Sequence, residues 1–479
     1  MVSNSDNDGT AIGCFGGFKL LRFPKRKQET SPATKVPSVS NYKNEKARCT
    51  SSHNLDFYAP SEWGVPTNNK QSVSDCVLPP YTAQNTTVQD PAEKTINEIL
   101  NELDPELYQL STKIHDHPEI GFEERFARDT LTAFMQHHGF NVTSGYLGLE
   151  TAWKAEYSHG TDGKVIGINS EMDALSGIGH ACGHNLIAAS GCGIAVALKA
   201  ALETHGIPGK IILLGTPAEE AEGEKSSSSS EVDTTRWISV SHPGPGPQRT
   251  FDLGTTIAIQ TFEVEYLGKS AHAGAAPWEG VNALDAAFLA YSSLSVLRQQ
   301  MQPTQRSHGI VEGRDWISNV IPDNARLRWQ VRASTYEELS TLTERVLKCF
   351  QAAALATGCT VKIDQEPPYY ELKQNPVLAK VFTNVVQTHF GHSVTQQGSS
   401  ASTDFGNVGF YLPALHPMYS IPTKPNGGNH TPAFTKASAT KEAHAANMIT
   451  TRSLALTSLQ ILQNEYLFQG MKAAFASGL

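Results

Sequence analysis

The chain of 479 residues lacks the surplus of basic residues that a nucleic-acid partner normally requires. Its 38 lysines and arginines stand against 47 aspartates and glutamates, which gives a formal net charge of −9. Nucleic-acid-binding proteins instead gather positive charge on one face or along one helix. The composition therefore argues against DNA or RNA as a partner.

Cysteines and long apolar runs are also scarce. The seven cysteines are odd in number and scattered, so they do not form the dense disulfide framework of a small secreted protein. No window approaches 18 consecutive apolar residues, and no basic stretch precedes an apolar core near the N-terminus. We therefore expect no membrane partner and a cytoplasmic location.

Two common motifs of nucleotide-binding and hydrolytic enzymes are missing. The segment GIGHACG at 177–183 does not match the G-x-G-x-x-G pattern of dinucleotide sites. The segment GHSVT at 391–395 lacks the second glycine of a nucleophile elbow. Neither a dinucleotide cofactor nor a serine nucleophile of that type has support in the sequence.

Composition and apolar spacing divide the chain into regions. Residues 1–90 are rich in Ser, Asn, Pro, Lys and Thr with little apolar periodicity, which predicts a largely disordered extension. Residues 91–255 and 369–479 alternate predicted strands with helices, which implies a mostly parallel sheet with helices on its faces. Residues 256–368 follow the order β-α-β-β-α-β of a ferredoxin-like unit. We predict an α/β domain in two parts, interrupted by this smaller α+β domain. In the second part we expect a helix at 376–390, a strand at 417–421 and a closing helix at 437–465.

Polar clusters follow three predicted strands of the larger domain. The buried-strand runs are 164–170, 210–216 and 236–241. After them come, in order, the loop that contains Cys182, the tetrapeptide PAEE, and His242. Because ligands of such sheets bind beyond the carboxyl ends of the strands, we expect these clusters to meet in one site.

The side chains in these clusters are of the types that bind zinc-like ions, which take Cys, His and carboxylate ligands. Cys182 and His184 are two positions apart, so an extended loop directs both side chains the same way. Five ligands, with one of the two adjacent glutamates counted, are too many for one tetrahedral ion but suit a pair of ions that share bridging groups. The candidate donors are Cys182, His184, Glu219, Glu220, His242 and His430, with Asp173 as a bridging or orienting carboxylate.

The adjacent Glu219 and Glu220 cannot both face one ion from a regular strand. At a strand end, however, one carboxylate can bind metal while the other holds a water. A metal lowers the pKa of its bound water toward ~7, and a free carboxylate beside it can take the proton. This pair therefore predicts hydrolysis.

Other interpretations of the same residues remain to be weighed. A nucleophile pair formed by Cys182 and His184 lacks an obvious acid to orient the histidine. Lone buried histidines are more often structural than catalytic, and we interpret His115, His117 and His180 in this way.

Eight motifs, in order along about 94–465, resemble one known family. They are IHDHPEIGFEE, DALSGIGHACGHNLIAASG, TPAEE, SHPG, KSAHAGAAPWEGVNALDAA, NVIPD, STDFGNV and NHTPAF. This set resembles the dinuclear-metal amidohydrolases of peptidase family M20, in the subgroup of hippurate, auxin-conjugate and aminobenzoyl-glutamate hydrolases. The combination of GIGHACGHNLIA with AHAGAAPWEGVNALDAA is most similar to the branch typified by β-alanyl-lysine dipeptidase.

The resemblance implies a catalytic domain at 91–255 and 369–479, with 256–368 as a lid that mediates homodimerisation. It also implies two divalent ions per subunit, with zinc as the first expectation and manganese or cobalt as alternatives. Glu219 would be the general base, and Asp173 would orient the ligands. By the family pattern the metal ligands would be Cys182, His184, Glu220, His242 and His430.

Two residues of the inserted domain gain a role only from the resemblance. His272, in SAHAG, would reach the developing oxyanion of the substrate, usually in the site of the partner subunit. Asn319, in SNVIPD, would bind substrate near it. The chain departs from the family pattern after PAEE, where it has AEGEKSSSSSEVDTTRW, and at Arg314, Asp315 and Trp316.

We therefore predict a metal-dependent amidohydrolase or dipeptidase that cleaves a small N-acyl amino acid or dipeptide-like substrate. An amide-forming enzyme that uses the same site is one alternative. A non-catalytic dimeric binding protein is another, but a decayed relative should have lost a ligand or the base, and none is missing here.

Overall fold

The computed structural model describes residues 90–220, 236–313 and 316–478. The predicted N-terminal extension lies outside the described residues apart from its last position. Most of the segment that follows PAEE, together with Arg314 and Asp315, also lies outside them.

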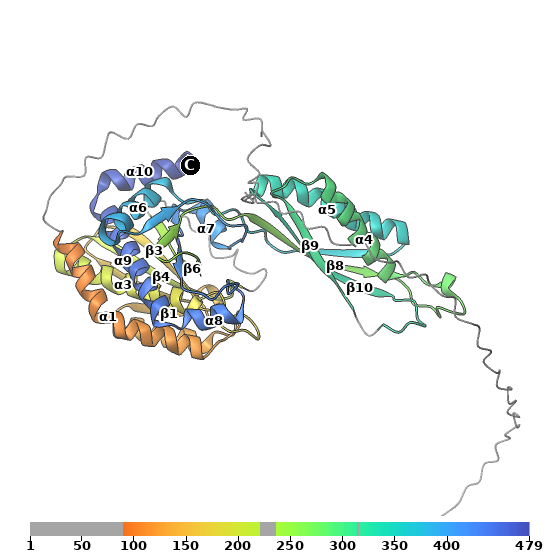
Figure 1. Ribbon diagram of the computed structural model, residues 1–479, viewed down its shortest axis with the longest axis horizontal. Coiled ribbons are helices and arrows are strands. Elements are labelled where there is room, and N and C mark those ends of the chain that lie inside the picture. Colours follow the sequence, from red (N-terminus) through yellow and green to blue (C-terminus); the bar gives the residue numbers. More distant parts are fainter. Residues whose placement is uncertain (1–89, 221–235, 314–315, 479) are drawn as a thin grey trace, which may run out of the picture. The chain divides into compact units, whose positions relative to one another are not determined.

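A six-stranded sheet of order β1-β2-β4-β3-β5-β13 forms the centre of the larger domain (Figure 1). Three of its five pairings are parallel: β3 with β4, β3 with β5, and β5 with β13. The two antiparallel pairings lie at one edge. The predicted mostly parallel sheet is therefore confirmed. The strands are β1 Asn141–Ser144, β2 Trp153–His159, β3 Lys164–Glu171, β4 Gly209–Thr216, β5 Arg236–Ser239 and β13 Ala414–Leu415.

Helices pack on this sheet, and α3 is the most buried of them. It contacts α1 and α9 as well as β3 and β4. Among the described residues it is the one helix long and apolar enough to span a membrane, but 89% of its apolar window is buried, as in a core helix. The helices are α1 Pro91–Asp116, α2 Arg125–His137, α3 His184–His205, α6 Pro376–Phe390, α7 Phe405–Tyr411, α8 Pro432–Ser438, α9 Lys441–Gln463 and α10 Glu465–Ala476.

The closing helix predicted at 437–465 corresponds to α9, whose ends lie a few residues inside these bounds because side-chain caps fix where α9 and α10 begin. Thr440 accepts a hydrogen bond from the backbone of Ala443 and begins α9. Asn464 accepts one from Leu467 and begins α10. Such caps satisfy backbone donors that a helix start leaves without partners.

A second sheet, of order β12-β7-β14-β6, lies in the same domain. Only its strand β14 was expected from the sequence, at 417–421. The sheet matters for the site because His242 is the first residue of β6, which pairs in parallel with β14. Its strands are β6 His242–Pro245, β7 Thr250–Asp252, β12 Ser393–Thr395 and β14 Met418–Ile421.

The inserted domain has its own antiparallel sheet of order β11-β8-β10-β9, with α4 and α5 packed on it. In chain order this is fourth, first, third and second strand, as a ferredoxin-like unit requires, so this part of the fold prediction is also confirmed. Phe262, Trp329 and Phe350 are fully buried in its core. Its elements are β8 Ala258–Leu267, α4 Ala283–Leu297, β9 Arg306–Glu312, β10 Asn324–Ala333, α5 Tyr336–Thr357 and β11 Thr360–Gln365; short 3-10 helices lie at Tyr146–Gly148, Pro277–Glu279 and Arg298–Gln300.

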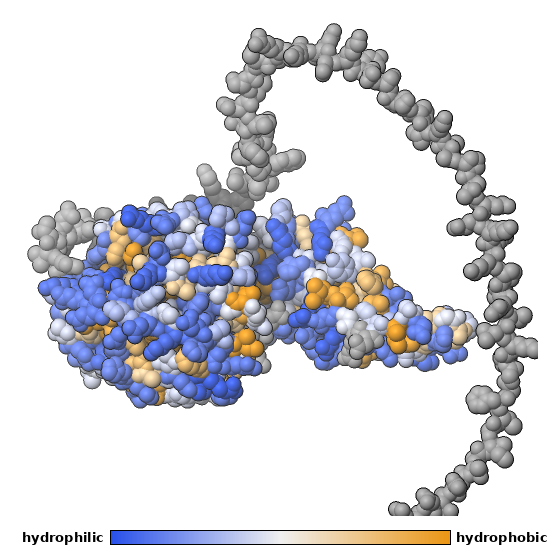
Figure 2. All heavy atoms as spheres, turned by 60° about the horizontal axis from the view of Figure 1, so that its bottom comes forward, coloured by the Kyte–Doolittle hydropathy of each residue, from blue (hydrophilic) through white to orange (hydrophobic). Residues whose placement is uncertain are grey.

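One face of α4 remains exposed although it is apolar. Alanines and Leu294 of α4 are buried against the sheet, whereas Leu289 and Val296, seven positions apart and so on one face, are 38% and 71% exposed. Apolar groups are visible on the surface (Figure 2). An apolar helix face of this kind is typical of an interaction surface.

Candidate active site

The predicted metal ligands come together where β3, β4 and β5 end. Cys182 and His184 lie at the start of α3, Glu220 lies just after β4, and His242 begins β6 after β5. His430 precedes α8, and its backbone N–H donates to Ala181 O at 2.9 Å. Segments up to 248 residues apart in the chain, from 182 to 430, thus supply one cluster.

A glycine allows the backbone between Cys182 and His184 to adopt a left-handed conformation close to the neighbouring chain. Gly183 has φ +85, and a Cβ at this position would lie 2.5 Å from Pro243 Cγ. Only glycine meets both conditions without displacing the neighbouring chain. The GHACGHN turn can therefore present Cys182 and His184 while His242 comes close from the next strand.

The donor atoms form three overlapping groups. One consists of Cys182, His184 and His242, a second of Cys182, Glu220 and His430, and within each group the atoms lie within 4.8 Å of one another. The third group joins Glu171 to His184 and Glu219. Because Cys182 and His184 each belong to two groups, the donors surround two neighbouring positions.

The distances fit shared metal ions. Two ligands at about 2.1 Å from one tetrahedral ion are ~3.4 Å apart. Cys182 Sγ lies 3.1 Å from His242 Nε2, and His430 Nε2 lies 3.1 Å from Glu220 Oε1. A mixed set of thiolate, imidazole and carboxylate suits zinc-like ions.

His184 gives a test of this fit. Its Nδ1 contacts Asp173 at 2.9 Å to the backbone oxygen and 3.1 Å to Oδ1, the arrangement that orients metal-bound histidines. Its Nε2 is buried and, within the described part of the chain, has no hydrogen-bond partner. Carboxylate oxygens of Glu219, Glu171 and Glu220 lie 3.7, 3.8 and 4.0 Å from it. These distances are too long for hydrogen bonds but fit ligands around a common ion.

Burial decides between the two interpretations of Cys182. It raises the pKa of the Cys182 thiol well above its ordinary value, so without a metal the thiol stays protonated at neutral pH. A protonated thiol is a poor nucleophile, whereas a bound cation deprotonates a coordinating thiol. The environment therefore favours a metal ligand over a nucleophile.

Glu219 and Glu220 differ in their surroundings. Burial opposes ionisation of Glu220, but the hydrogen bond with His430 and the charge of His184 outweigh it, so its pKa is lowered. The backbone N–H of Glu220 donates to Asp173 Oδ2 at 2.8 Å. Glu219 instead accepts a hydrogen bond at Oε1 from Thr403 Oγ1 at 3.1 Å. The two carboxylates are thus held by different partners.

Two residues near the cluster were missed from the sequence. Glu171, at the end of β3, is fully buried, accepts from Asn169 Nδ2 at 3.0 Å and joins the donor group of His184. It stands two positions before Asp173, and that spacing at a strand end was the available signal. His416 is buried with its ring stacked on His242 at 6.0 Å between centroids; no pattern in its segment pointed to it.

His272 and Asn319 lie in the inserted domain, and the structure brings them together. Ala273 N donates to Asn319 O at 2.9 Å, and both His272 and Asn319 are exposed. Nδ1 of His272 accepts from the backbone of Gly274 and Ala275, which leaves its Nε2 to act as a donor. Neither His272 nor Asn319 lines the pocket that contains Glu219 and Glu220 of the same chain.

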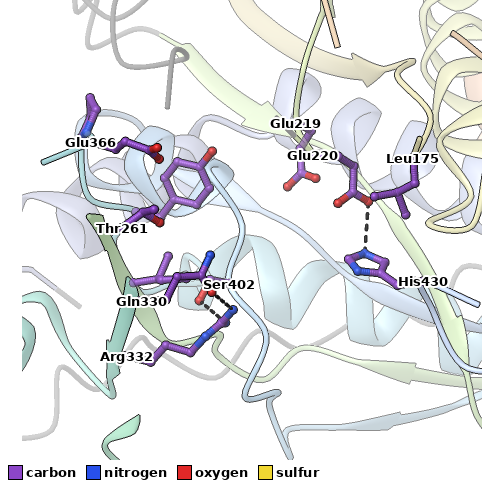
Figure 3. Close-up of a pocket in the computed structure, with 12 residues that line it drawn as sticks. Leu175, Glu219, Glu220, Thr261, Gln330, Arg332, Glu366, Ser402 and His430 are labelled. Atoms are coloured by element: carbon purple, nitrogen blue, oxygen red, sulfur yellow. Dashed lines mark hydrogen bonds and ion pairs between the residues drawn. The ribbon is translucent and has the colours of Figure 1, made fainter. Parts of the chain in front are cut away.

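That pocket has a volume of about 330 Å³ and also contains residues from the base of the inserted domain (Figure 3). Arg332 lines it, with Nη1 3.2 Å from Ser402 Oγ and Nη2 3.4 Å from Gln330 Oε1. Among the described residues no carboxylate pairs with this guanidinium, and burial lowers its pKa. Glu366 lines the same pocket.

Comparison with known proteins agrees with this geometry. Residues 258–357 match the peptidase dimerisation domain. The chain is 38% identical to the Xaa-Arg dipeptidase of Mus musculus over 79% of its own length and 90% of the relative. It is 37% identical to the Xaa-Arg dipeptidase of Homo sapiens, with the same two shares. The crystal structure of the YXEP protein of Bacillus subtilis, described as a dinuclear metal-binding peptidase, has a TM-score of 0.59 at 20% identity and covers 76% of this chain and 99% of that one.

The likeness to the dipeptidases covers nearly their whole length, and the donor cluster is that of a metal-binding site. The amide-forming and the non-catalytic alternatives find no support in these relatives. The chain belongs to peptidase family M20 and is a metal-dependent hydrolase of the dipeptidase and amidohydrolase type.

Proposed function

We propose that this enzyme hydrolyses dipeptides with a free carboxylate and a basic C-terminal residue at a site for two divalent ions, with zinc as the first candidate. The observation that carries the proposal is the set of three overlapping donor groups, next to a pocket lined by Glu219, Glu220 and the guanidinium of Arg332. The ligands are Cys182, His184, Glu220, His242 and His430, and Glu171 lies close enough to join them.

Divalent ions bound there would lower the pKa of a water and polarise the amide carbonyl. The carboxylate of Glu219 accepts the proton of the attacking water and then passes it to the leaving amine. Thr403 Oγ1 donates a hydrogen bond to Glu219 Oε1 at 3.1 Å, which helps to hold this carboxylate in place. Asp173 holds His184 through Nδ1 and Glu220 through its backbone, so both ligands keep their orientation.

We assign substrate selection to the pocket residues that the inserted domain supplies. Arg332 offers two N–H groups to a carboxylate, and such charge-assisted pairs are strong in a half-buried place. Glu366 lines the same pocket and suits a cationic side chain. The name of the relatives, Xaa-Arg dipeptidases, supports a substrate with both groups.

In a homodimer, His272 and Asn319 would serve the site of the partner subunit. Their exposure and their absence from the pocket of their own chain support this arrangement. Nε2 of His272 then donates to the developing oxyanion. We also retain the two-part catalytic domain at 91–255 and 369–479, the lid at 256–368, and a cytoplasmic location as parts of the proposal.

The decisive experiment replaces Glu219 by glutamine. Glu219→Gln should keep the fold and the bound metal but lower kcat on an Xaa-Arg dipeptide about 10²- to 10⁴-fold, because the amide cannot take the proton. Glu98→Gln, on the exposed face of α1, is the matched control and should leave kcat unchanged. Full turnover by Glu219→Gln would refute the mechanism.

A second experiment tests the substrate class. Arg332→Met should lower kcat/KM for a free dipeptide about 10- to 100-fold, because a hydrogen-bonded charge pair is lost. The same variant should change kcat/KM for the C-terminal amide of that dipeptide little. Equal losses on both substrates would mean that Arg332 does not bind the carboxylate.

A further inference from the structure

A buried carboxylate of the motif PEIGFEE, at 118–124, has no part in the chemistry proposed above. Glu124 has no exposed surface and stands immediately before α2. Its Oε1 accepts a hydrogen bond from the backbone N–H of Ala218 at 2.8 Å. Ala218 directly precedes Glu219, so this contact joins a distant acidic motif to the turn that carries the proposed base.

The contacted turn has an unfavourable backbone conformation. Ala218 has φ +60, in the left-handed region that a residue with a Cβ rarely adopts. Such a conformation persists only where the surroundings hold it in place. Ala218 is 2% exposed, and a buried N–H must keep an acceptor. Glu124 supplies that acceptor.

The turn is held on both sides of Glu219. Glu124 accepts from the N–H of Ala218, and Asp173 accepts from the N–H of Glu220, each at 2.8 Å. Because two buried carboxylates fix the residues before and after it, the backbone of Glu219 has little freedom to rotate. The direction of its carboxylate follows from that restraint.

Glu124 is itself part of a rigid segment. The carboxylate of Glu119 accepts from the backbone N–H groups of Phe126 and Ala127 at 2.9 and 3.0 Å, and so caps α2. The backbone oxygen of Glu119 accepts from Ala174 N at 2.8 Å, next to Asp173. The motif is thus fixed at α2, at the end of β3 and at the turn after β4.

We propose that Glu124 is a positioning residue that holds the Ala218–Glu220 turn and thereby aims the carboxylate of Glu219 in the reaction. This inference rests on the proposed role of Glu219 as the base. The length of the Glu124 side chain matters for this role, because it brings the acceptor oxygen to the N–H of Ala218. Its charge matters less, because that N–H is neutral. It does not touch substrate or metal.

Two conservative variants distinguish the effect of side-chain length at position 124 from the effect of its charge. Glu124→Gln keeps an oxygen at the same distance but loses the charge, and its kcat should stay within about threefold of the wild type. Glu124→Asp keeps the charge but is one methylene shorter, and its kcat should fall about 10- to 100-fold with KM and metal content unchanged. In both variants the melting temperature shows whether the fold persists.

The opposite order, with Glu124→Asp active and Glu124→Gln impaired, would overturn the proposal in favour of an electrostatic role. Equal kcat per folded molecule in both variants, with only the melting temperature lowered, would reduce Glu124 to a structural residue. Glu219→Gln separates the two levels of inference. If that variant keeps full turnover, the proposed function fails; if it is inactive while Glu124→Asp is unaffected, only the positioning role fails.

Discussion

The end of β4 and the surface of α4 differ in the kind of side chain that each exposes to solvent. At the end of β4, charged side chains are largely buried and have polar partners: Glu220 pairs with His430, and Glu219 accepts from Thr403. On α4, apolar side chains are exposed, Val296 at 71%. The first arrangement is suited to a cation among its carboxylates, and the second is suited to a partner surface over it. Each region therefore indicates a component that the single chain does not supply.

The largest effect should come from removing one of the proposed metal ligands. Cys182→Ala takes away the donor shared by two groups, so we expect loss of at least one bound ion and a fall in kcat of more than about 10³-fold. Metal content per chain and turnover measure this. Cys359→Ala, in the inserted domain, is the matched control and should keep both. Full metal content in Cys182→Ala would contradict the ligand assignment.

The next prediction concerns the contribution of the inserted domain to the catalytic site. His272→Ala should lower kcat about 10²- to 10³-fold, since one oxyanion donor is lost. Mixing His272→Ala with Glu219→Gln subunits should restore activity to about a quarter of the wild type, because half of the dimers are mixed and each has one complete site. If mixing restores nothing while mixed dimers form, His272 acts within its own chain or not at all.

The exposed face of α4 can be tested directly. Val296→Lys should weaken dimerisation about 10- to 100-fold, because it places a charge in an apolar interface. Sedimentation at several concentrations measures the dimer dissociation constant. Leu355→Lys, 86% exposed on α5, is the control and should leave it unchanged. Dissociation by Leu355→Lys rather than by Val296→Lys would move the interface to the other helix.

The smallest effect is a pH dependence at the metal site. Burial raises the pKa of Cys182, so the metal-free protein holds this thiol protonated at neutral pH, and binding an ion must release the proton. Metal affinity should therefore rise with pH, by up to about tenfold per pH unit below the raised pKa. Titration with Zn²⁺ between about pH 6 and 8 measures the slope. A flat profile would mean that Cys182 does not bind as a thiolate.

Local sequence patterns were sufficient to predict many of the helices and strands and most of the candidate metal ligands. Residues 165–168 and 211–215 show no alternation of apolar and polar residues because β3 and β4 are interior strands of the sheet. Cys182 and His242 could be proposed as partners because each follows a strand of one parallel sheet. The helix at 376–390 was predicted with its bounds as α6 has them, since Pro at its start and Gly at its end are local signals.

Contacts between distant segments could not be found in this way. Glu171 and His416 look like ordinary core-flanking residues until β3 and the segment after β13 are folded around His184 and His242. Glu124 is 94 residues from Ala218, and no local spacing connects them. The side-chain caps at Thr440 and Asn464 set where α9 and α10 begin, and apolar periodicity does not indicate these positions.

The sequence by itself determined the family, the fold class and the residue types of the site, because these depend on motifs, periodicity and order along the chain. The tertiary structure alone decided which donors meet, which carboxylate of PAEE contacts Thr403 and which contacts His430, and that Ala218 is kept in a left-handed conformation. The physical reason is that direction and burial are properties of packed neighbours, and those neighbours come from segments far apart in the chain.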